Sequence, residues 1–302
     1  MTTDPFNDTC FVYDHSDSAK LSFVTRDDDS FIYGGLAWYN TRDAFVGDEY
    51  AASSETVGKT NIVSFDLSGK IIDRIYEAEY GERALACYPS RDDKYLIFTS
   101  EKTLGQGSSP LESLAPMVAL GIIDLSKKEV IVRIDSFGRL PNIKIKESPW
   151  LQSGYRFVYS MDGTTQFILE GEEQPINPLA TKAGVYIFDV ASSKSSLLVP
   201  DGFSPIASPV SNQIAYEKDH CVIVRDFSNN TERVLYKYKS NEKLLSKHWA
   251  PDGKAIFISY LSSSQLGEMF KTSGSKLIDV VTGDEFPFKH IGMMYGSSYT
   301  WK

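Results

Sequence analysis

Short runs of apolar residues alternate with polar segments along nearly the whole of this chain. Most runs have the length of a β-strand, and they are bounded by residues that favour turns. Only residues 260–275 carry a pattern compatible with a short amphipathic helix. The pattern therefore predicts an all-β protein.

One apolar run recurs along the chain with an aspartate at its end, and polar turn residues follow it. An aspartate side chain closes a tight turn by hydrogen bonding to nearby backbone, and Gly or Asn adopts the positive φ that many turns require. Each copy therefore predicts a strand, a turn and a second strand. The six copies are 11–14, 62–66, 121–124, 185–189, 222–226 and 276–279.

A second pattern precedes the first in most copies. It is clearest over residues 249–258, where Trp-Ala-Pro-Asp-Gly-Lys leads into an apolar run. Weaker versions occur at 38–46, 88–98, 150–158 and 209–216. Each version predicts another hairpin, so the two patterns together give four strands per repeat. A four-stranded unit that recurs at this spacing is typical of a β-propeller blade.

The clearest copy of the second pattern, together with the apolar run, aspartate and Thr-Gly turn that end at residue 283, resembles the WD40-like repeat of TolB-like propellers. The resemblance covers nearly the whole chain. It implies one domain over residues 1–302, a six-bladed β-propeller with four-stranded antiparallel blades. Propellers serve many roles, so the resemblance indicates a fold more specifically than a function.

The repeat phase places blades at about 31–80, 81–138, 139–200, 201–243 and 244–291, and the sixth is shared between 292–302 and 10–30. Strands from the N- and C-terminal ends then close the ring in the last blade, which removes free sheet edges. The chain stops where the second strand of that blade should begin. Three arrangements remain: a three-stranded blade, a strand supplied by residues 1–9, or a truncated chain.

The chain is acidic, with a formal net charge of −9 at pH 7. Such a surface repels phosphate backbones, so we expect no nucleic-acid partner. There is no apolar run long enough to span a membrane, and the first residues lack the features of a signal peptide. Cys10, Cys87 and Cys221 are widely separated and indicate free thiols. We expect a cytoplasmic protein, or a periplasmic one if the chain is a trimmed mature form.

Loop lengths indicate where a partner would bind. The loops between second and third strands are long in four blades, at about 47–60, 101–117, 161–183 and 260–275. Long loops without structure of their own are usually functional or disordered, and these four share one face. The candidate partner-binding residues in them are Phe167, Glu170, Glu172, Glu173, Met269 and Phe270.

Two sets of recurring residues indicate structure rather than chemistry. Trp38, Trp150, Trp249 and Trp301 occupy one phase of the repeat, so we expect them to pack the blades and not to stack on a ligand. The aspartates that end the third strands recur in the same way, and we expect them to form turns.

Catalytic motifs are lacking, and we expect no catalytic residue and no cofactor. The chain contains no Gly-x-Ser-x-Gly, no complete phosphate-binding loop and no His-x-x-x-His pair. Some TolB-like relatives, the oligogalacturonate lyases, hold a metal through several histidines in the central channel. Here His248, on an innermost strand, is the weak candidate for such a ligand, and His290 is a less favourable one.

Two hypotheses about function follow. The first is a non-enzymatic scaffold that binds a protein or peptide on the face with the long loops. The alternative is a carbohydrate-active or metal-binding propeller of the oligogalacturonate-lyase kind, with a small ligand in the central channel. The sequence leans toward the first because it contains no credible catalytic constellation.

Overall fold

The computed structural model describes residues 2–4, 9–13, 20–24, 26–27, 30–51, 60–79, 81–102, 117–136, 143–145, 149–161, 182–262 and 272–287. All regular elements in these ranges are β-strands. The same ranges contain no helix that could cross a membrane. The prediction of an all-β protein is therefore confirmed. The strands belong to two compact units.

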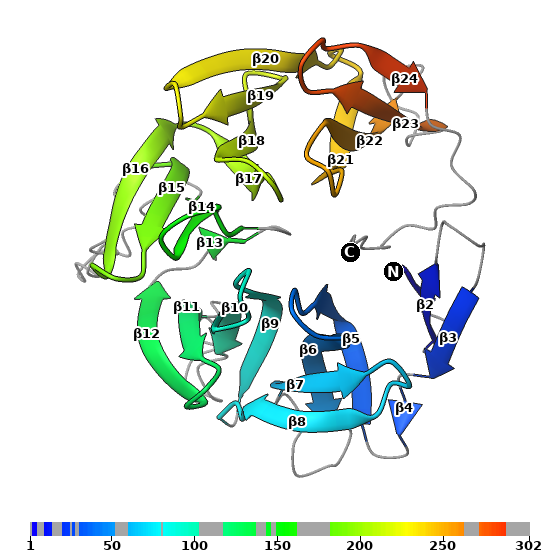
Figure 1. Ribbon diagram of the computed structural model, residues 1–302, viewed down its shortest axis with the longest axis vertical. Helices are drawn as coiled ribbons and strands as arrows, with labels where there is room; N and C mark the ends of the chain where they lie inside the picture. Colours follow the sequence, from blue (N-terminus) through cyan, green and yellow to red (C-terminus); the bar gives the residue numbers. More distant parts are fainter. Residues whose placement is uncertain are drawn as a thin grey trace, which may run out of the picture. The chain divides into compact units, whose positions relative to one another are not determined.

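The first unit comprises Met1–Ile145, Met161–Ala183 and Gly296–Lys302. Its nine-stranded sheet has the order β12-β11-β10-β9-β7-β6-β5-β4, and β8 pairs with β7 (Figure 1). The sheet consists of two antiparallel groups of four, β5 to β8 and β9 to β12, and a parallel bridge between Thr60 and Arg83 joins them. The bounds are β4 Arg26–Asp27, β5 Ser30–Trp38, β6 Ala44–Ala51, β7 Thr60–Asp66, β8 Ile71–Tyr76, β9 Glu82–Pro89, β10 Tyr95–Lys102, β11 Met117–Asp124 and β12 Glu129–Ser136. The first unit also contains the short strand β13, Ile143–Lys144, which belongs to a different sheet.

A smaller sheet of the first unit has the order β1-β2-β3, with bounds Thr2–Asp4, Thr9–Tyr13 and Lys20–Val24. The strand β1 pairs with β2 in antiparallel fashion. Residues near the start of the chain therefore supply a strand to this sheet.

The second unit comprises Lys146–Ser160 and Gly184–Tyr295. It contains two complete four-stranded sheets, β17-β18-β19-β20 and β21-β22-β23-β24, and the strands β14, β15 and β16 of a third. The bounds are β14 Arg156–Met161, β15 Gly184–Asp189, β16 Lys194–Pro200, β17 Phe203–Ala207, β18 Gln213–Lys218, β19 Cys221–Asp226, β20 Thr231–Lys237, β21 Glu242–Trp249, β22 Ala255–Ser262, β23 Thr272–Asp279 and β24 Glu285–Pro287.

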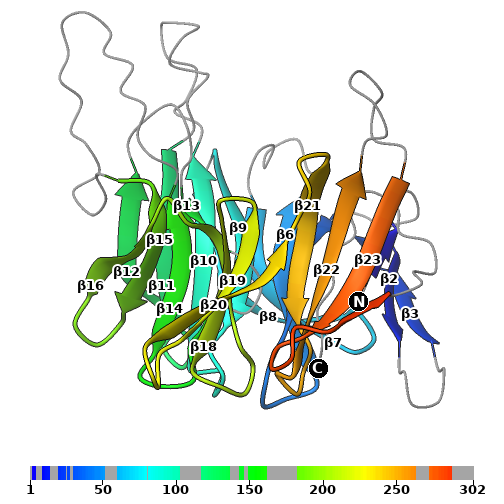
Figure 2. The ribbon, with the colours of Figure 1, turned by 90° about the horizontal axis from the view of Figure 1, so that it is seen from above.

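Each four-stranded group has two distinct ends, seen from the side in Figure 2. Short turns join the first strand to the second and the third to the fourth, and we call this the turn end. The opposite end, which we call the loop end, carries the connections between second and third strands and the links between groups. The turns are 39–43, 67–70, 90–94, 125–128, 190–193, 208–212, 227–230, 250–254 and 280–284.

The structure shortens the loops that the sequence predicted. The strand β6 continues to Ala51, so the expectation of a loop from residue 47 is wrong. The sequence misled here because Asp48 and Glu49 are charged, yet both are buried in the strand. Residues 260–262 and 272–275 belong to β22 and β23 and not to a helix. The remaining parts, 52–59, 103–116, 162–181 and 263–271, lie outside the described residues.

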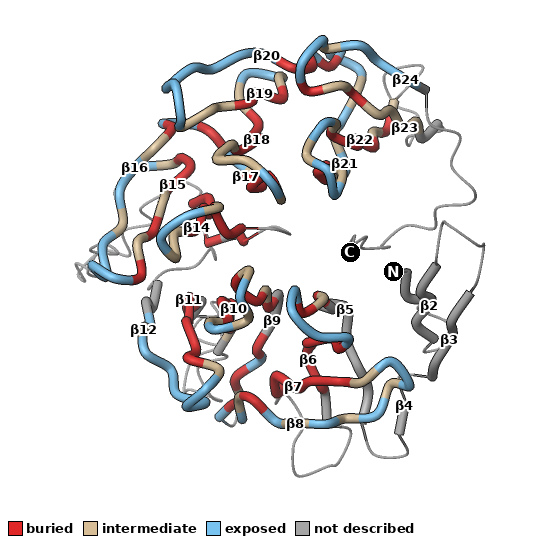
Figure 3. Tube along the Cα trace, viewed as in Figure 1, coloured by how far each residue is buried: buried red, intermediate tan, exposed pale blue. Residues whose placement is uncertain are grey.

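The core of each unit lies between its four-stranded groups, and the fourth strands are its exposed side (Figure 3). In the first unit Tyr39, Val46 and Leu96 belong to one buried cluster. In the second unit a larger cluster joins Ile206 and Tyr238 to Trp249. Fourth strands such as β20 are exposed over most of their length. Apolar packing between neighbouring sheets is therefore the main source of stability in each unit.

Candidate functional site

The predicted partner-binding residues cannot be placed. Phe167, Glu170, Glu172 and Glu173 fall in 162–181, and Met269 and Phe270 fall in 263–271, both outside the described residues. His248, the candidate metal ligand, lies on β21 and is 7% exposed. Its ring faces Phe257, with ring centroids 6.2 Å apart. His248 is therefore a buried side chain beside an aromatic ring.

The tryptophans pack the sheets, as their periodicity predicted. Trp249 is buried, and its indole Nε1 donates a hydrogen bond of 3.3 Å to the carbonyl oxygen of Ile206 in the preceding sheet. Trp150 is buried against Phe157. Trp301 lies outside the described residues. Trp150 and Trp249 are therefore packing residues, whereas Trp38, which contacts Phe45, is half-buried.

The aspartates that end the third strands form turns. Asp226 accepts a hydrogen bond from the amide of Ser228, at 2.7 Å, and Asp279 accepts two, from Val281 and Thr282. Hydrogen bonds of this kind hold the pKa of each carboxyl below its ordinary value. The five aspartates with this shift are Asp66, Asp124, Asp189, Asp226 and Asp279. The sixth, Asp14, lies outside the described residues.

A polar position inside the sheets was missed by sequence reasoning. The fifth residue of the second strand is polar and buried in every described group, and these residues are Asp48, Thr99, Ser160, Glu217 and Ser259. Buried polar groups need partners, and the first strand of the following sheet supplies one for Ser160, whose Oγ accepts from the amide of Ser204 at 3.3 Å. Aligning the second strands would have revealed this position, because apolar residues surround it.

The strongest of these contacts is an ion pair in the second unit. The Lys247 ammonium lies 2.6 Å from the Glu217 carboxylate, and the two side chains are 2% and 9% exposed. Glu217 belongs to β18 and Lys247 to β21, so the pair joins neighbouring sheets. Removing two charges from water is costly, and a buried pair of this kind is more often found where specificity or function requires it.

The corresponding place in the first unit holds a different pair of groups. Asp48 takes the place of Glu217, and Cys87, the sixth residue of β9, takes the place of Lys247 in β21. Burial raises the pKa of the Cys87 thiol, and the charge of Asp48 raises it further. The thiol is therefore held in its protonated, unreactive form. At this place in β9, the first unit therefore has a neutral thiol where β21 of the second unit has a lysine.

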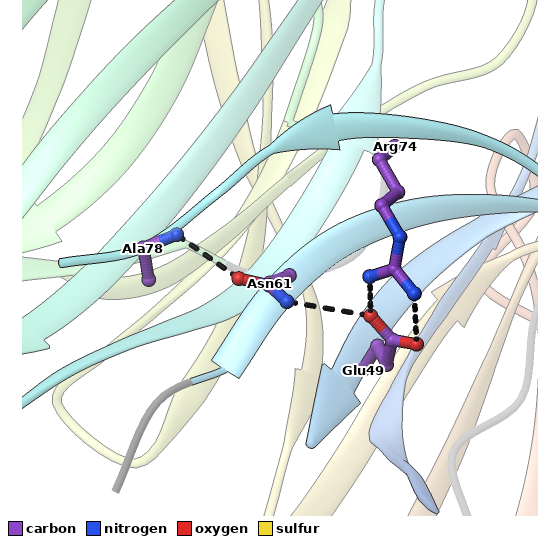
Figure 4. Close-up of polar contacts among 4 residues, drawn as sticks. All are labelled: Glu49, Asn61, Arg74 and Ala78. Atoms are coloured by element: carbon purple, nitrogen blue, oxygen red, sulfur yellow. Dashed lines mark hydrogen bonds and ion pairs between the residues drawn. The ribbon is translucent and has the colours of Figure 1, made fainter. Parts of the chain in front are cut away.

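A carboxylate is also buried at the loop end of the first unit. Glu49 receives two contacts from the Arg74 guanidinium, one of them at 3.0 Å, and a third from the side-chain amide of Asn61 at 3.3 Å (Figure 4). The Asn61 oxygen in turn accepts from the amide of Ala78 at 3.1 Å. The bidentate geometry fixes the guanidinium plane against the carboxylate. This cluster therefore ties β6, β7 and the link after β8 together.

Another network stabilises the link between the two groups of the first unit. The carboxylate of Glu82, which is 0% exposed, accepts from the Tyr76 hydroxyl at 2.8 Å and from the amide of Glu79 at 3.2 Å, and Arg133 lies 3.0 Å away. Burial and the nearby carboxylate raise the pKa of Tyr76 to about 12. Burial acts to raise the pKa of Glu82, but its hydrogen bonds hold that pKa below the ordinary value. We call this set the Glu82 clasp.

The second unit repeats the arrangement with different charges. Glu242 accepts from the Tyr236 hydroxyl at 3.0 Å and from the amide of Lys239 at 2.9 Å, and the Lys276 ammonium donates to Tyr236 at 3.3 Å. We call this set the Glu242 clasp. In both clasps the tyrosine precedes the glutamate by six residues and the amide precedes it by three. That spacing is the sequence signal that could have found them.

A metal site does not fit the described residues. No group of three or more His, Cys, Asp and Glu side chains among them is placed to hold an ion. His248 therefore has no set of companion ligands in this part of the chain, and we assign no chemistry to a metal.

The described side chains at this place are therefore suited to binding, and they include no nucleophile paired with a base. Lys247 and Lys276 lie at the level of Ile258, in the middle of the sheet β21 to β24, and each is held by a carboxylate. Hydrogen bonds to Glu285 and Tyr236 raise the pKa of Lys276, although its burial acts in the opposite direction. The lysine therefore remains charged over the whole physiological range of pH.

Three solved structures show what this chain is similar to. An oligogalacturonate lyase in complex with manganese has a TM-score of 0.51 at 12% identity, over 92% of this chain and 71% of that one. The oligogalacturonate lyase of Vibrio parahaemolyticus has a TM-score of 0.52 at 11% identity, with the same coverage. The acylaminoacyl peptidase of Pyrococcus horikoshii has a TM-score of 0.55 at 11% identity, over 96% of this chain and 43% of the peptidase.

No family model and no curated protein matches the sequence. The structural likeness at these low identities concerns the fold alone. The two lyases and the peptidase are β-propeller proteins, and the matches extend over almost all of this chain. The chain therefore has the β-propeller fold that its repeats predicted.

Proposed function

We propose that this protein is a carbohydrate-active propeller that binds acidic oligosaccharides. The observation that carries the proposal is the likeness to two oligogalacturonate lyases over 92% of the chain and 71% of each lyase. This likeness supports the alternative hypothesis of the sequence analysis better than the scaffold hypothesis. Oligogalacturonate is a chain of sugar acids, so a binding site for it needs cationic side chains.

The second unit offers side chains of that kind on strands of a rigid scaffold. Lys247 and Lys276 lie on β21 and β23, where each is paired with a carboxylate of the chain itself. The described residues contain no credible acid, base or metal constellation. We therefore propose recognition of the sugar acid and assign no bond-breaking step. The central channel as the place of the ligand stays a prediction.

We also propose the finer architecture that the sequence predicted. In it, one domain over 1–302 forms six four-stranded blades of the TolB-like kind. Support comes from the recurring hairpins and from the groups β5 to β8, β9 to β12, β17 to β20 and β21 to β24, each of which has the strand order expected of a blade. A cytoplasmic location stays a prediction.

Calorimetric titration with oligomers of galacturonate, with and without manganese, tests the proposed function. We expect saturable binding that does not require the metal, and binding to the neutral oligomer of galactose weaker by about tenfold or more, because carboxylate contacts are lost. Release of shortened products in the same samples would add a catalytic activity. Equal affinity for the charged and the neutral oligomer would refute recognition of the acid.

A second candidate is the scaffold hypothesis, in which a protein or peptide binds the loop face. The specific observation in its favour is that the Glu82 and Glu242 clasps and the Glu49 cluster all brace the loop end. Replacing 162–181 by a short Gly-Ser linker should then abolish capture of a partner, whereas the same replacement of 103–116 serves as the control. Retention by both variants would place the binding surface elsewhere.

A further inference from the structure

The sixth residue of the second strand differs in character between the described groups. It is Glu49 in β6, Ser100 in β10, Met161 in β14, Lys218 in β18 and Tyr260 in β22. Tyr260 is the aromatic member of this set, and it is half-buried near the loop end of β21 to β24. We infer that Tyr260, Lys276 and Glu285, which we call the sugar subsite, bind one sugar ring, an inference that rests on the proposed function and gives it a place.

A glycine sets the position of the Tyr260 ring. Tyr260 and Gly274 pair directly across β22 and β23. A Cβ atom built at Gly274 would lie 2.5 Å from the Cζ atom and from the hydroxyl oxygen of Tyr260, which is closer than such atoms approach in proteins. The outer end of the ring therefore lies over the backbone of β23, in space that a side chain at position 274 would fill.

Two charged side chains lie beside this ring on the same face of the sheet. Successive side chains of a strand point to opposite faces, so Lys276 shares the face of Gly274 and Tyr260. Glu285 of β24 pairs with Ile278 and belongs to that face as well. The Lys276 ammonium lies 5.5 Å from the centroid of the Tyr260 ring and 2.7 Å from the Glu285 carboxylate. The strand register and the distances therefore bring the three side chains together.

The neighbouring sheet fixes the position of the ammonium. The Nζ atom of Lys276 donates to the Tyr236 hydroxyl at 3.3 Å and lies 4.8 Å from the centroid of the Tyr236 ring. That hydroxyl is itself held by the carboxylate of the Glu242 clasp. Contacts with described residues use two of the three N–H donors of Lys276. A donor that is already held in place loses little conformational freedom when a ligand binds.

The charged groups of the sugar subsite are within reach of solvent. The side chain of Lys276 is 23% exposed and that of Glu285 is 45% exposed. An ion pair that is open to water in this way contributes little to stability. Folding alone therefore does not account for a lysine, a carboxylate and a half-buried aromatic ring at one place.

The chemistry of the sugar subsite suits the hydroxyl groups and the ring face of a sugar. A hydroxyl group both donates and accepts hydrogen bonds, so neighbouring hydroxyls of one ring can accept from Lys276 and donate to Glu285. Sites for small molecules combine an aromatic surface with a few placed polar groups, and Tyr260 supplies that surface. The charges of Lys276 and Glu285 balance each other. The subsite therefore recognises the part of the ring that galacturonate and galactose share.

The test uses three variants of the sugar subsite and one matched control. Gly274→Ala displaces the Tyr260 ring and keeps every polar group, Tyr260→Leu removes the ring, and Lys276→Gln removes the ammonium. The control is Lys128→Gln, which removes an ion pair of 2.6 Å with Asp73 at the turn end. Calorimetric titration with the oligomers of galacturonate and of galactose should show affinities for both that are lower by about tenfold in the three variants and unchanged in the control. Cooperative thermal unfolding shows that each variant is folded.

The two oligomers separate this inference from the proposed function. If the unaltered chain prefers galacturonate and the three variants bind it equally well, the subsite is wrong and the proposed function stands. A loss confined to galacturonate would mean that these side chains contact its carboxylate, which would also overturn the inference. If the unaltered chain binds both oligomers equally and the variants weaken both, the subsite stands and recognition of the acid is refuted. Binding of neither oligomer would overturn both.

Discussion

At the residue scale, the interior of the described sheets contains charged side chains that are buried and paired. Glu217 and Lys247 are almost wholly removed from water, and each is the main partner of the other. The cost of removing the two charges from water is offset only while both are present. Replacing only one of the two residues therefore lowers the free energy of unfolding more than replacing both.

We predict that Lys247→Met destabilises the protein by about 3 kcal/mol, because it leaves Glu217 buried without a counter-charge. The double variant Glu217→Leu, Lys247→Met should recover most of that loss, since apolar side chains suit the surrounding cluster. Urea denaturation measures both free energies of unfolding. Lys254→Met, at an exposed position, should have little effect. Additive losses in the double variant would contradict the account.

The two clasps allow a matched comparison of one hydrogen bond. Tyr76→Phe removes a donor from Glu82, which is completely buried, and should cost about 1–2 kcal/mol of unfolding free energy. Tyr236→Phe removes the same bond from Glu242, which is half-buried and can be reached by water, and should cost less. Urea denaturation of the two variants gives the order. A larger loss for Tyr236→Phe would show that burial of the glutamate does not set the cost.

Hairpins are the recurring element, and their turns could be predicted from the sequence. The repeat predicted a turn after the aspartate that ends β23. The structure has this turn, and Asp279 accepts two backbone amide hydrogen bonds in it. The ends of the second strands could not be predicted in the same way. Asp48 and Glu49 were placed in a loop because charged residues are rarely buried, and only the partners from other strands, such as Arg74, make their burial tolerable.

The turn aspartates predict how stability depends on pH. Their pKa values lie below the ordinary 3.8 in the folded chain, because the charged forms accept hydrogen bonds. The stability that they supply is therefore fully present above that pH and is lost as the pH falls through the lowered values. We expect Asp279→Asn to be less stable than the unaltered chain at neutral pH and to lose less stability on acidification.

Urea denaturation at neutral pH and at about pH 3 measures this difference. Asp201→Asn is the control, because that exposed carboxylate accepts no hydrogen bond from the described residues. An acid-induced loss of the same size in Asp279→Asn and in the unaltered chain would show that the turn carboxylates do not cause it.

At the scale of the whole molecule, the fold could be predicted better than the site. Six phased repeats indicated the propeller, and the likeness to propeller enzymes over more than nine-tenths of the chain agrees. The Glu82 and Glu242 clasps were not predicted. They depend on which residues of separate strands meet, for example Arg133 of β12 and Glu82 of β9, and a pattern within one strand does not contain that information.

A crystal structure of the protein grown with an oligomer of galacturonate tests the central claim most directly. We predict a bound oligosaccharide whose carboxylates lie within hydrogen-bond distance of lysine side chains of the protein. Crystals grown at saturating oligosaccharide that contain no bound sugar would contradict the account.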